Sequence, residues 1–394
     1  MVLFFGFILT IRRAVHLTTV LAKQITRRFY GRSHRKAYYT GCSSGGKQGL
    51  RSITSFPEDF DGMRTSCLSD FPGTLIGAPA YSWNHLNAYT LRVNMYQSDN
   101  SLPGYIPPEK VKFMAQQIIN ACDELDGVKD GVISNPRVCQ FRPESLLCKY
   151  YPKATAECFT PAQVVNLANI FRDYVETNST YIFPAFERGS EWLWSVTGRN
   201  WTLQPLYYSN LILNISAESR SPHSLNLSTI ELADEINPGD IIANDPHLEL
   251  FFNRGGKVIH YHGWADGLIP SRTSVDYYNR VERTIPSDFS DSYRLFMIPG
   301  MGHCKSGPGP WVFNNNSDTF HLDPLADMLK HLVDWVENGN APEVLLGTKY
   351  INDTGPGVEF QRPICPYPGR SDLDWKGRLE GCKHLEMQID VSQL

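Results

Sequence analysis

The sequence lacks any long run of Lys or Arg, any Cys-x-x-Cys pair, any internal repeat and any low-complexity tract. Without a basic run, and with a formal net charge of −4, nothing electrostatic points to nucleic acid or to an anionic membrane surface. Without Cys-x-x-Cys pairs, no zinc site is indicated. What is present is an ordinary globular composition of 394 residues, 42% hydrophobic and 20% charged, enough for one large domain or two moderate ones. A small or neutral substrate is therefore the default expectation.

The nine cysteines include pairs that are close enough in sequence to be bridged, as expected in an oxidising compartment. These predicted disulfides are Cys122–Cys139, Cys148–Cys158 and Cys365–Cys382. N-x-S/T sequons, which agree with passage through a secretory pathway, stand at Asn178, Asn200, Asn214, Asn226, Asn315 and Asn352. The N-terminal segment MVLFFGFILTIRRAVH has no basic stretch before its apolar run and no small-residue cleavage site, so it is a poor signal peptide, and the run is too short to span a bilayer. The cysteines and sequons in the interior of the chain thus indicate a secreted protein, whereas no signal peptide is expected in this sequence.

Apolar periodicity predicts the main elements. An amphipathic helix is expected from Ala14 to Phe29, because Val15, Val20, Leu21, Ala22 and Ile25 recur at helical spacing. Short strands are expected at Lys36 to Thr40, Leu75 to Gly77, Lys257 to His262 and Tyr293 to Ile298, each followed by a Gly or Pro turn. After the first strand and the glycine-rich segment GCSSGG, a helix is expected that starts at Lys47 and is ended by Pro57. A final helix is expected from Pro324 to Asn338, with an apolar face of Leu325, Met328, Leu329, Leu332, Val333 and Val336.

Between Ala80 and about Glu249 the pattern changes to mixed helices and loops rich in aromatic residues, including Trp192, Trp194 and Trp201. We interpret this stretch as an inserted lid. The predicted organisation is a first part of the core at residues 1–80, a lid domain at 81–249 and a second part of the core at 250–394. The predicted strands alternate with predicted helices along the chain, and this order predicts an α/β fold.

Residues 41–45, GCSSG, fit the G-x-S-x-G pattern between a predicted strand and a predicted helix. Glycines permit the sharp turn that exposes a serine hydroxyl, here Ser43, and the helix start presents backbone N–H groups. The N–H of Ser44 is the expected donor to an oxyanion. With 30 glycines in the chain, the same pattern also arises in a simple Gly-rich turn, so the motif alone does not decide.

A nucleophilic serine needs a base and an orienting carboxylate, in the chain order Ser, Asp or Glu, His for α/β hydrolases. Asp266 follows one predicted strand within GWADG, and His303 follows the next within PGMGHC. Loops after strand ends are where catalytic groups gather in open α/β sheets. A turn aspartate and a surface histidine are the alternatives, but neither explains the order. The sequence therefore predicts a triad of Ser43, Asp266 and His303.

Cys42 precedes Ser43 and Cys304 follows His303, so a disulfide between these cysteines would tie the nucleophile turn to the histidine loop. Closing so long a loop contributes on the order of 5 kcal/mol in the chain-entropy model. Two buried thiols are the alternative.

With these motifs the chain resembles the tannase and feruloyl esterase family, whose mark is a Cys-Ser, Asp, His-Cys constellation with the cysteines bridged. The resemblance runs from about Arg13 to the C-terminus through RAVH, YYTGCSSGG, GAPA, CDELDGVKDGVI, HGWADGLIP and PGMGHC. It implies an α/β-hydrolase fold with a lid over the site. It also implies that Ser43 attacks an ester carbonyl, that His303 shuttles the proton and that Asp266 holds the imidazole.

Asp123, Asp126 and Asp130, interleaved with glycines, place three carboxylates in one loop, as a hard cation such as calcium requires. The loop is no EF-hand, because the position expected for a bidentate Glu holds Ser134. The family resemblance implies Ca²⁺ bound by these aspartates and by the carbonyls of Val128 and Val132. A solvated acidic turn is the alternative.

Two features depart from the family pattern. An α/β hydrolase builds several strands before its nucleophile elbow, and about forty residues cannot hold them. We therefore expect the N-terminal part of the core, with a second oxyanion donor, to be missing from this sequence. In addition, Met63 to Gly73, which carries the odd Cys67, interrupts a family-like segment within an expected buried strand. A gene-model error such as translated intron is the hypothesis for this insertion.

The leading functional prediction is a secreted hydrolase of phenolic esters, feruloyl or galloyl, whose ester is small or linked to a polysaccharide. The alternatives are an inactive truncated paralogue of the family and a calcium-dependent carbohydrate-binding protein without turnover. The ordered triad counts against the last of these.

Overall fold

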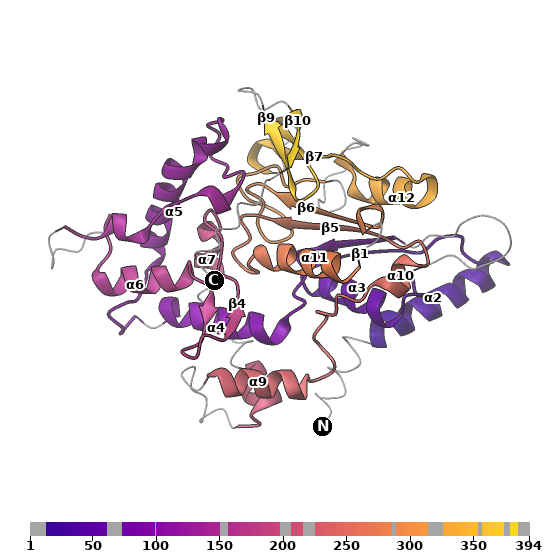
Figure 1. Ribbon diagram of the computed structural model, residues 1–394, viewed down its shortest axis with the longest axis horizontal. Coiled ribbons are helices and arrows are strands. Elements are labelled where there is room, and N and C mark those ends of the chain that lie inside the picture. Colours follow the sequence, from indigo (N-terminus) through magenta and orange to yellow (C-terminus); the bar gives the residue numbers. More distant parts are fainter. Residues whose placement is uncertain are drawn as a thin grey trace.

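A parallel sheet of four strands, in the order β1-β2-β5-β6, lies at the centre of the molecule (Figure 1). The computed structural model describes residues 13–60, 73–98, 100–149, 157–197, 206–215, 225–285, 289–313, 326–353, 357–373 and 379–384. The four strands are β1 (Tyr38–Cys42), β2 (Gly73–Gly77), β5 (Lys257–Gly263) and β6 (Tyr293–Ile298). Because the strands are parallel, the loops that follow β1, β5 and β6 emerge at the same edge of the sheet.

Helices cover both faces of this sheet. Helices α3 (Ser44–Ser55) and α11 (Arg272–Thr284) pack on one face, in a hydrophobic cluster that includes Leu50, Val258 and Val275. Helix α12 (Met328–Asn338) packs on the other face, in a cluster that includes Ile259, Tyr261 and Leu332. Strand residues alternate between these clusters because successive side chains of a strand point to opposite faces. The core is therefore a three-layer α/β/α arrangement.

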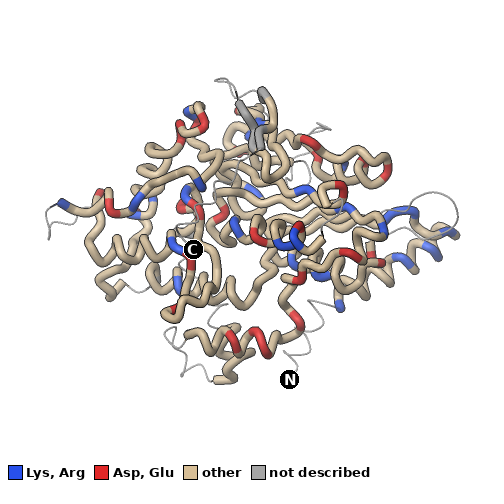
Figure 2. The backbone as a smooth tube through the Cα atoms, viewed as in Figure 1, with Lys and Arg blue, Asp and Glu red and all other residues tan. Residues whose placement is uncertain are grey.

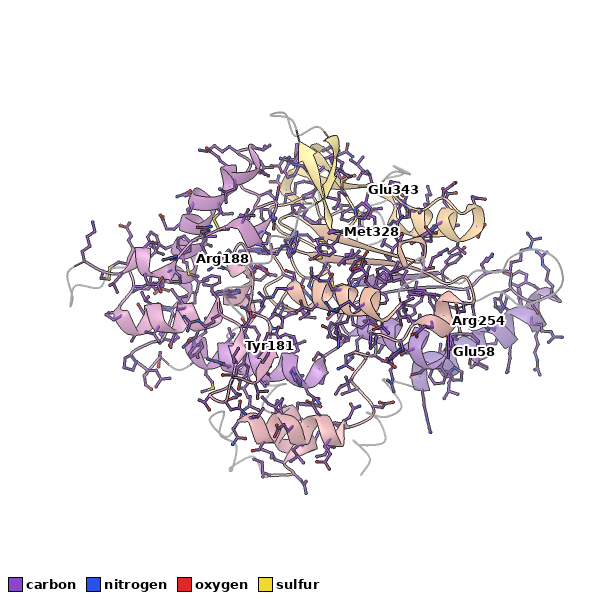
Figure 3. All side chains as sticks on the ribbon, in the orientation of Figure 1. Glu58, Tyr181, Arg188, Arg254, Met328 and Glu343 are labelled. Carbon is purple, nitrogen blue, oxygen red and sulfur yellow. A yellow bond between two sulfur atoms is a disulfide. The ribbon has the colours of Figure 1, made fainter. Side chains whose placement is uncertain are left out.

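A third hydrophobic cluster lies beside the sheet and consists of residues between Ala80 and Ala233, joined by Ile269. The elements of this region are α4 (Trp83–Ser98), α5 (Pro108–Cys122), α6 (Pro161–Ile170), β3 (Tyr174–Val175), β4 (Tyr181–Phe183), α7 (Glu191–Thr197) and α9 (Leu227–Ile236). Most of them lie to the left of the sheet in Figure 1, and Tyr181 and Arg188 lie among their side chains in Figure 3. This is the stretch predicted as a lid, whose boundaries remain predictions.

The remaining helices and strands are α2 (Ala14–Tyr30), α10 (Glu249–Phe252), β7 (Leu345–Tyr350), β8 (Val358–Ile364), β9 (Gly369–Leu373) and β10 (Leu379–His384). The predicted helix α2 is present, and Figure 2 shows its basic positions at the right of the molecule. Its apolar face is not buried against the described residues: Leu21 is 56% and Ile25 57% exposed. Sequence periodicity thus predicted the helix but not its exposure.

Several predicted boundaries are wrong in detail. The first strand, expected at Lys36 to Thr40, is Tyr38–Cys42, and the helix after it, expected from Lys47, begins at Ser44, directly behind the elbow. The final helix begins at Met328 rather than Pro324, because the side chain of Asp327 accepts a hydrogen bond from the Lys330 amide and caps the helix there. Gly73, which was assigned to the insertion, is the first residue of β2; the rest of that insertion, with Cys67, lies outside the described residues, as does Leu325.

Four disulfides join the cysteines in the predicted pairs, Cys42–Cys304, Cys122–Cys139, Cys148–Cys158 and Cys365–Cys382. Within the described part of the chain, no helix combines the length and apolar character needed to cross a membrane.

Candidate active site

Ser43 lies at the turn between β1 and α3. Its backbone has φ 63° and ψ −120°, a conformation that residues with a side chain rarely adopt. The amide of Ser43 donates to the carbonyl of Gly77 at 2.9 Å, and its carbonyl accepts from Lys47 at 3.0 Å. These bonds hold the strained turn between two strands and the first turn of the helix, as a nucleophile elbow requires.

The glycines of this turn are required by close backbone contacts. A Cβ on Gly41 would lie 2.8 Å from the carbonyl carbon of Gly45, and one on Gly46 would lie 2.4 Å from the carbonyl oxygen of Gly77. Larger residues would therefore push α3 away from the end of β1. The Ser44 amide is at the first position of α3, where a helix leaves N–H groups without an intrahelical acceptor. Its role as oxyanion donor remains a prediction.

Asp266 and His303 come together from the loops after β5 and β6. The two loops are tied to each other by the amide of Ala265, which donates to the carbonyl of Met301 at 3.0 Å. His303 Nδ1 lies 2.8 Å from Asp266 Oδ2. The other carboxylate oxygen of Asp266 accepts from the amides of Leu268 at 2.8 Å and Ile269 at 2.9 Å. The carboxylate is therefore fixed on both of its oxygens.

Asp266 is only 1% exposed, yet its environment favours the charged form. Burial alone would raise the pKa of Asp266, but the charge of His303 and the hydrogen bonds from His262 and His303 hold it below its ordinary range. An ionised carboxylate at this position accepts the Nδ1 hydrogen of His303 and leaves Nε2 free to take up a proton.

The Cys42–Cys304 disulfide brings the nucleophile turn to the histidine loop, with 6.0 Å between the two Cα atoms. In the described structure the Ser43 hydroxyl makes no hydrogen bond with His303; such bonds commonly tighten only when substrate is bound. The catalytic roles of Ser43, Asp266 and His303 therefore remain predictions, supported by their placement at one edge of the sheet.

Helix α7 of the lid region packs directly on the two catalytic loops. A Cβ on Gly302 would lie 2.5 Å from the ring of Trp192, and one on Gly267 would lie 2.7 Å from Cβ of Leu193. The indole N–H of Trp192 is buried and has no hydrogen-bond partner among the described residues. An aromatic ring with an unused donor thus lies beside the loop of His303.

Two described cavities lie away from this constellation. One, of about 590 Å³, lies between β4 and α11 and is lined by Tyr181, Arg272 and Asp276 among others. The other, of about 150 Å³, lies beside the acidic loop and β8. Neither is lined by the predicted triad, so the catalytic assignment depends on the hydrogen bonds and the disulfide and not on cavity size.

Sequence reasoning missed the buried polar residues behind Asp266. His262 Nε2 lies 3.0 Å from Asp266 Oδ2, and His262 and His260 both contact the hydroxyl of Ser274 on α11. The two histidines stand two residues apart in a strand, which places them on the same face. In the sequence, these buried residues were indicated only by the pair of histidines at this spacing in an otherwise apolar strand.

The acidic loop begins at η2 (Asp123–Asp126) and folds around Asp123. The Oδ1 atom of Asp123, which is 7% exposed, accepts from the amides of Asp130, Gly131 and Val132 at 2.9 to 3.2 Å. Asp126 Oδ1 accepts from the amide of Val128 at 2.9 Å. The three carboxylates are therefore drawn into one loop by backbone amides.

The charge of this loop is only partly compensated. Asp130 pairs with Arg362, and burial raises the pKa of Asp130, an effect to which the nearby charges of Asp126 and Asp123 add. An excess of carboxylate fits the chemistry of a hard cation. No group of three or more His, Cys, Asp or Glu side chains in the described residues is arranged to hold a metal ion, so Ca²⁺ binding by the loop and by the carbonyls of Val128 and Val132 stays a prediction.

Comparison with known proteins agrees with this geometry. A family model described as "Tannase and feruloyl esterase" matches residues 11–385. A protein of Aspergillus clavatus described as "Probable feruloyl esterase B" is 34% identical over 368 residues, covering 91% of this chain and 67% of that protein. The crystal structure of feruloyl esterase B from Aspergillus oryzae superposes with a TM-score of 0.84 at 31% identity, covering 94% of this chain and 74% of the other.

The tannin acyl hydrolase of Aspergillus niger superposes with a TM-score of 0.74 at 23% identity, over 93% of this chain and 68% of that one, which bears on the fold alone. The predicted α/β-hydrolase fold is thereby confirmed.

Proposed function

This chain belongs to the tannase and feruloyl esterase family of carboxylic ester hydrolases, and we propose that it hydrolyses esters of phenolic acids, feruloyl or galloyl, by a Ser43-His303-Asp266 mechanism. The observation that carries the proposal is the hydrogen bond of 2.8 Å between His303 and Asp266. The loop of His303 is also joined by the Cys42–Cys304 disulfide to the residue before Ser43.

In this mechanism His303 Nε2 removes the proton of the Ser43 hydroxyl as Ser43 attacks the ester carbonyl. The Ser44 amide stabilises the oxyanion, and His303 then donates the proton to the departing alcohol. Water enters with His303 again as base and releases the acid. Asp266 keeps the Nδ1–H tautomer and compensates the charge that His303 acquires.

The preference for an aromatic acid is supported by Trp192. Its ring lies against Gly302, next to His303. Stacking on an aromatic ring beside the reacting groups would favour a phenolic acid over an aliphatic one.

Substitution of the nucleophile tests the function. Purified Ser43→Ala should lose turnover of methyl ferulate and methyl gallate by about 10⁴-fold or more, because no other group forms the acyl-enzyme. Ser44→Ala is the matched control: it keeps the backbone N–H and should retain activity within about threefold, since the Ser44 side chain is exposed.

A folded wild-type protein without turnover of any ester in the panel would contradict the proposal and favour an inactive member of the family. Binding of a polysaccharide without turnover would favour the carbohydrate-binding alternative.

We further propose that the Asp123 loop binds Ca²⁺ as a structural ion of the lid region. The loop gathers three carboxylates, of which Asp130 is paired with Arg362. A bound calcium ion would neutralise the remaining charge and cross-link the loop.

Passage through a secretory pathway is proposed on the four disulfides and on the sequons whose asparagines are exposed. These are Asn178, Asn214, Asn226 and Asn352, whereas Asn200 and Asn315 lie outside the described residues. After expression through a secretory host, endoglycosidase treatment should lower the apparent mass of the chain. An unchanged mass would speak against glycosylation at these sites.

A further inference from the structure

A chain of buried polar side chains runs from the core to Asp266. Tyr293, His260, Ser274 and His262 are each 0% exposed. The Tyr293 hydroxyl lies 2.7 Å from His260 Nδ1, and His260 Nε2 lies 2.8 Å from Ser274 Oγ. Ser274 Oγ lies 2.6 Å from His262 Nδ1, and His262 Nε2 lies 3.0 Å from Asp266 Oδ2. The chain connects β6, β5 and α11 to the carboxylate that binds His303.

The direction of every hydrogen bond in this chain follows from its two ends. His262 Nε2 faces the Asp266 carboxylate and, at 3.2 Å, the carbonyl of Ile269; both are acceptors, so Nε2 carries hydrogen. In a neutral ring Nδ1 is then an acceptor, and Ser274 must give its single hydrogen to it. Ser274 in turn accepts from His260 Nε2–H, which leaves His260 Nδ1 to accept from Tyr293.

If the hydrogen bonds between His262 and Tyr293 all pointed the other way, the Tyr293 hydroxyl would be left unsatisfied. His262 would have to donate from both nitrogens, and His260 Nδ1–H would point at the Tyr293 oxygen. The buried Tyr293 hydroxyl, which has no other hydrogen-bond partner in the described structure, would then keep its own hydrogen unpaired. Buried donors without acceptors are rare because they have lost their bonds to water.

The charge states agree with the first direction. Burial lowers the pKa of His260 well below its ordinary value, and the neighbouring His262 adds to this effect. Burial raises the pKa of Tyr293, which therefore remains a donor. The titratable groups whose charges act on Asp266 are His303 and His262. The hydrogen bonds from Tyr293 to His262 thus end on the negative charge of Asp266.

We propose that His262 is a positioning residue that acts through Asp266. Held as an Nε2–H donor by the buried chain from Tyr293, it fixes Asp266 Oδ2 at the place from which this oxygen binds His303. The inference rests on the proposed role of His303 as base and deepens it. His262 and His303 donate to the same oxygen, so removal of the His262 donor takes away one of the two bonds that hold this oxygen and changes how it binds His303.

Two variants interrupt the chain at different points. His262→Phe removes the donor to Asp266, and Ser274→Ala removes the hydroxyl that orients His262 while leaving Asp266 and its direct partners in place. His262→Gln restores a donor and should recover part of what His262→Phe loses. His247→Phe is the matched control, because His247 is exposed and pairs with Glu249 far from this chain.

The first readout needs no substrate. In protein labelled with ¹⁵N-histidine, His260 and His262 should show the neutral Nε2–H tautomer from pH 6 to 8. The low-field resonance of the His303 Nδ1 proton should move in His262→Phe and Ser274→Ala but not in His247→Phe. A doubly protonated or Nδ1–H form of His262 would overturn the proposal, and so would an unmoved His303 resonance in both variants, whatever the activity.

The second readout is turnover. His262→Phe should lower kcat on the order of 10- to 100-fold with KM nearly unchanged, as expected for a misplaced catalytic group, and should shift the acid limb of the kcat profile. Loss of stability with kcat and the acid limb unchanged would reduce His262 to a structural residue. If wild type hydrolyses no ester, the proposed function fails, while the resonances still decide whether the chain positions Asp266.

Discussion

Two buried carboxylates in this protein have opposite properties because their partners differ. Asp266 lies between His303 and His262, whose charge and hydrogen bonds outweigh burial and lower its pKa. Glu191, 1% exposed on α7, accepts from the amide of Gly189 at 2.9 and 3.0 Å but has no cationic partner that outweighs its burial, and burial raises its pKa to about 7. Burial alone therefore does not determine the charge state of a carboxylate.

Glu191 should make stability depend on pH. Its pKa is higher in the folded protein than the ordinary value of 4.5, so the folded state binds more protons between pH 4.5 and about 7, and stability falls as pH rises through this window. Glu191→Gln still accepts from Gly189 and should be more stable than wild type above pH 7, on the order of 3 kcal/mol, with no gain near pH 4.5.

Thermal unfolding at a series of pH values measures this difference. Glu231→Gln, on the exposed side of α9, is the control and should follow the wild-type curve throughout. A Glu191→Gln shift of the same size at pH 4.5 and pH 8 would show that the carboxyl group does not titrate as described.

Among single residues, the sequence identified those whose order along the chain is typical of a known kind of site. Ser43, Asp266 and His303 could be selected because each follows a strand and because their order is that of α/β hydrolases. His260, His262 and Ser274 could not be joined, because their contact depends on how α11 packs across β5. The spacing of the two histidines indicates a shared face, but no local pattern identifies the hydroxyl that meets them.

Among the elements, the core strands were predictable, whereas the first residues of helices α3 and α12 were not. Each core strand is a short apolar run followed by a Gly or Pro turn, and all four are present. Helix ends depend on single capping contacts, such as the one made by Asp327. Strands β7 to β10 were not predicted, because they pair as two-stranded sheets outside the central sheet and their runs contain glycine, proline and charged residues that weaken the strand pattern.

The acidic loop is the element on which a bound ion would act. After treatment with EGTA, addition of Ca²⁺ at 100 times its Kd should stabilise the protein by about 2.7 kcal/mol, because the ion binds the folded loop only. Differential scanning calorimetry with and without Ca²⁺ measures the change in Tm. Asp126→Asn should remove most of it.

Glu124→Gln is the matched control, because Glu124 is exposed and pairs with Lys129 outside the set of loop carboxylates. The same Tm in EGTA and in Ca²⁺ would leave the loop a solvated acidic turn.

At the scale of the molecule, the lid region and the core are separate hydrophobic units that meet at the catalytic loops. The lid region has its own cluster, and the core has one cluster on each face of the sheet. Packing of α7 on Gly267 and Gly302 places Trp192 and Leu193 against the loops of Asp266 and His303. In the proposed mechanism the reacting groups therefore belong to the core, and α7 of the lid region packs against the loops that hold two of them.

The Cys42–Cys304 bond has a further consequence for the connectivity of the whole chain. It closes a covalent ring over a sequence separation of 262 residues, and this ring contains the entire lid region. A single protease cut in the lid should therefore leave one covalent molecule. A cleavage site inserted between the exposed Asn178 and Ser179, at the tip of the β3–β4 hairpin, tests this, because none of the other three disulfides spans that point.

The nicked protein should run as one band on a denaturing gel without reductant and as two bands with it, and it should keep its turnover. Cys42→Ser combined with Cys304→Ser should give two bands under both conditions; one band without reductant in this variant would show that another link holds the pieces. The turn of Ser43 and the loop of His303 thus stay attached by a path that does not pass through the lid region, so a protease cut there opens the ring without separating the two.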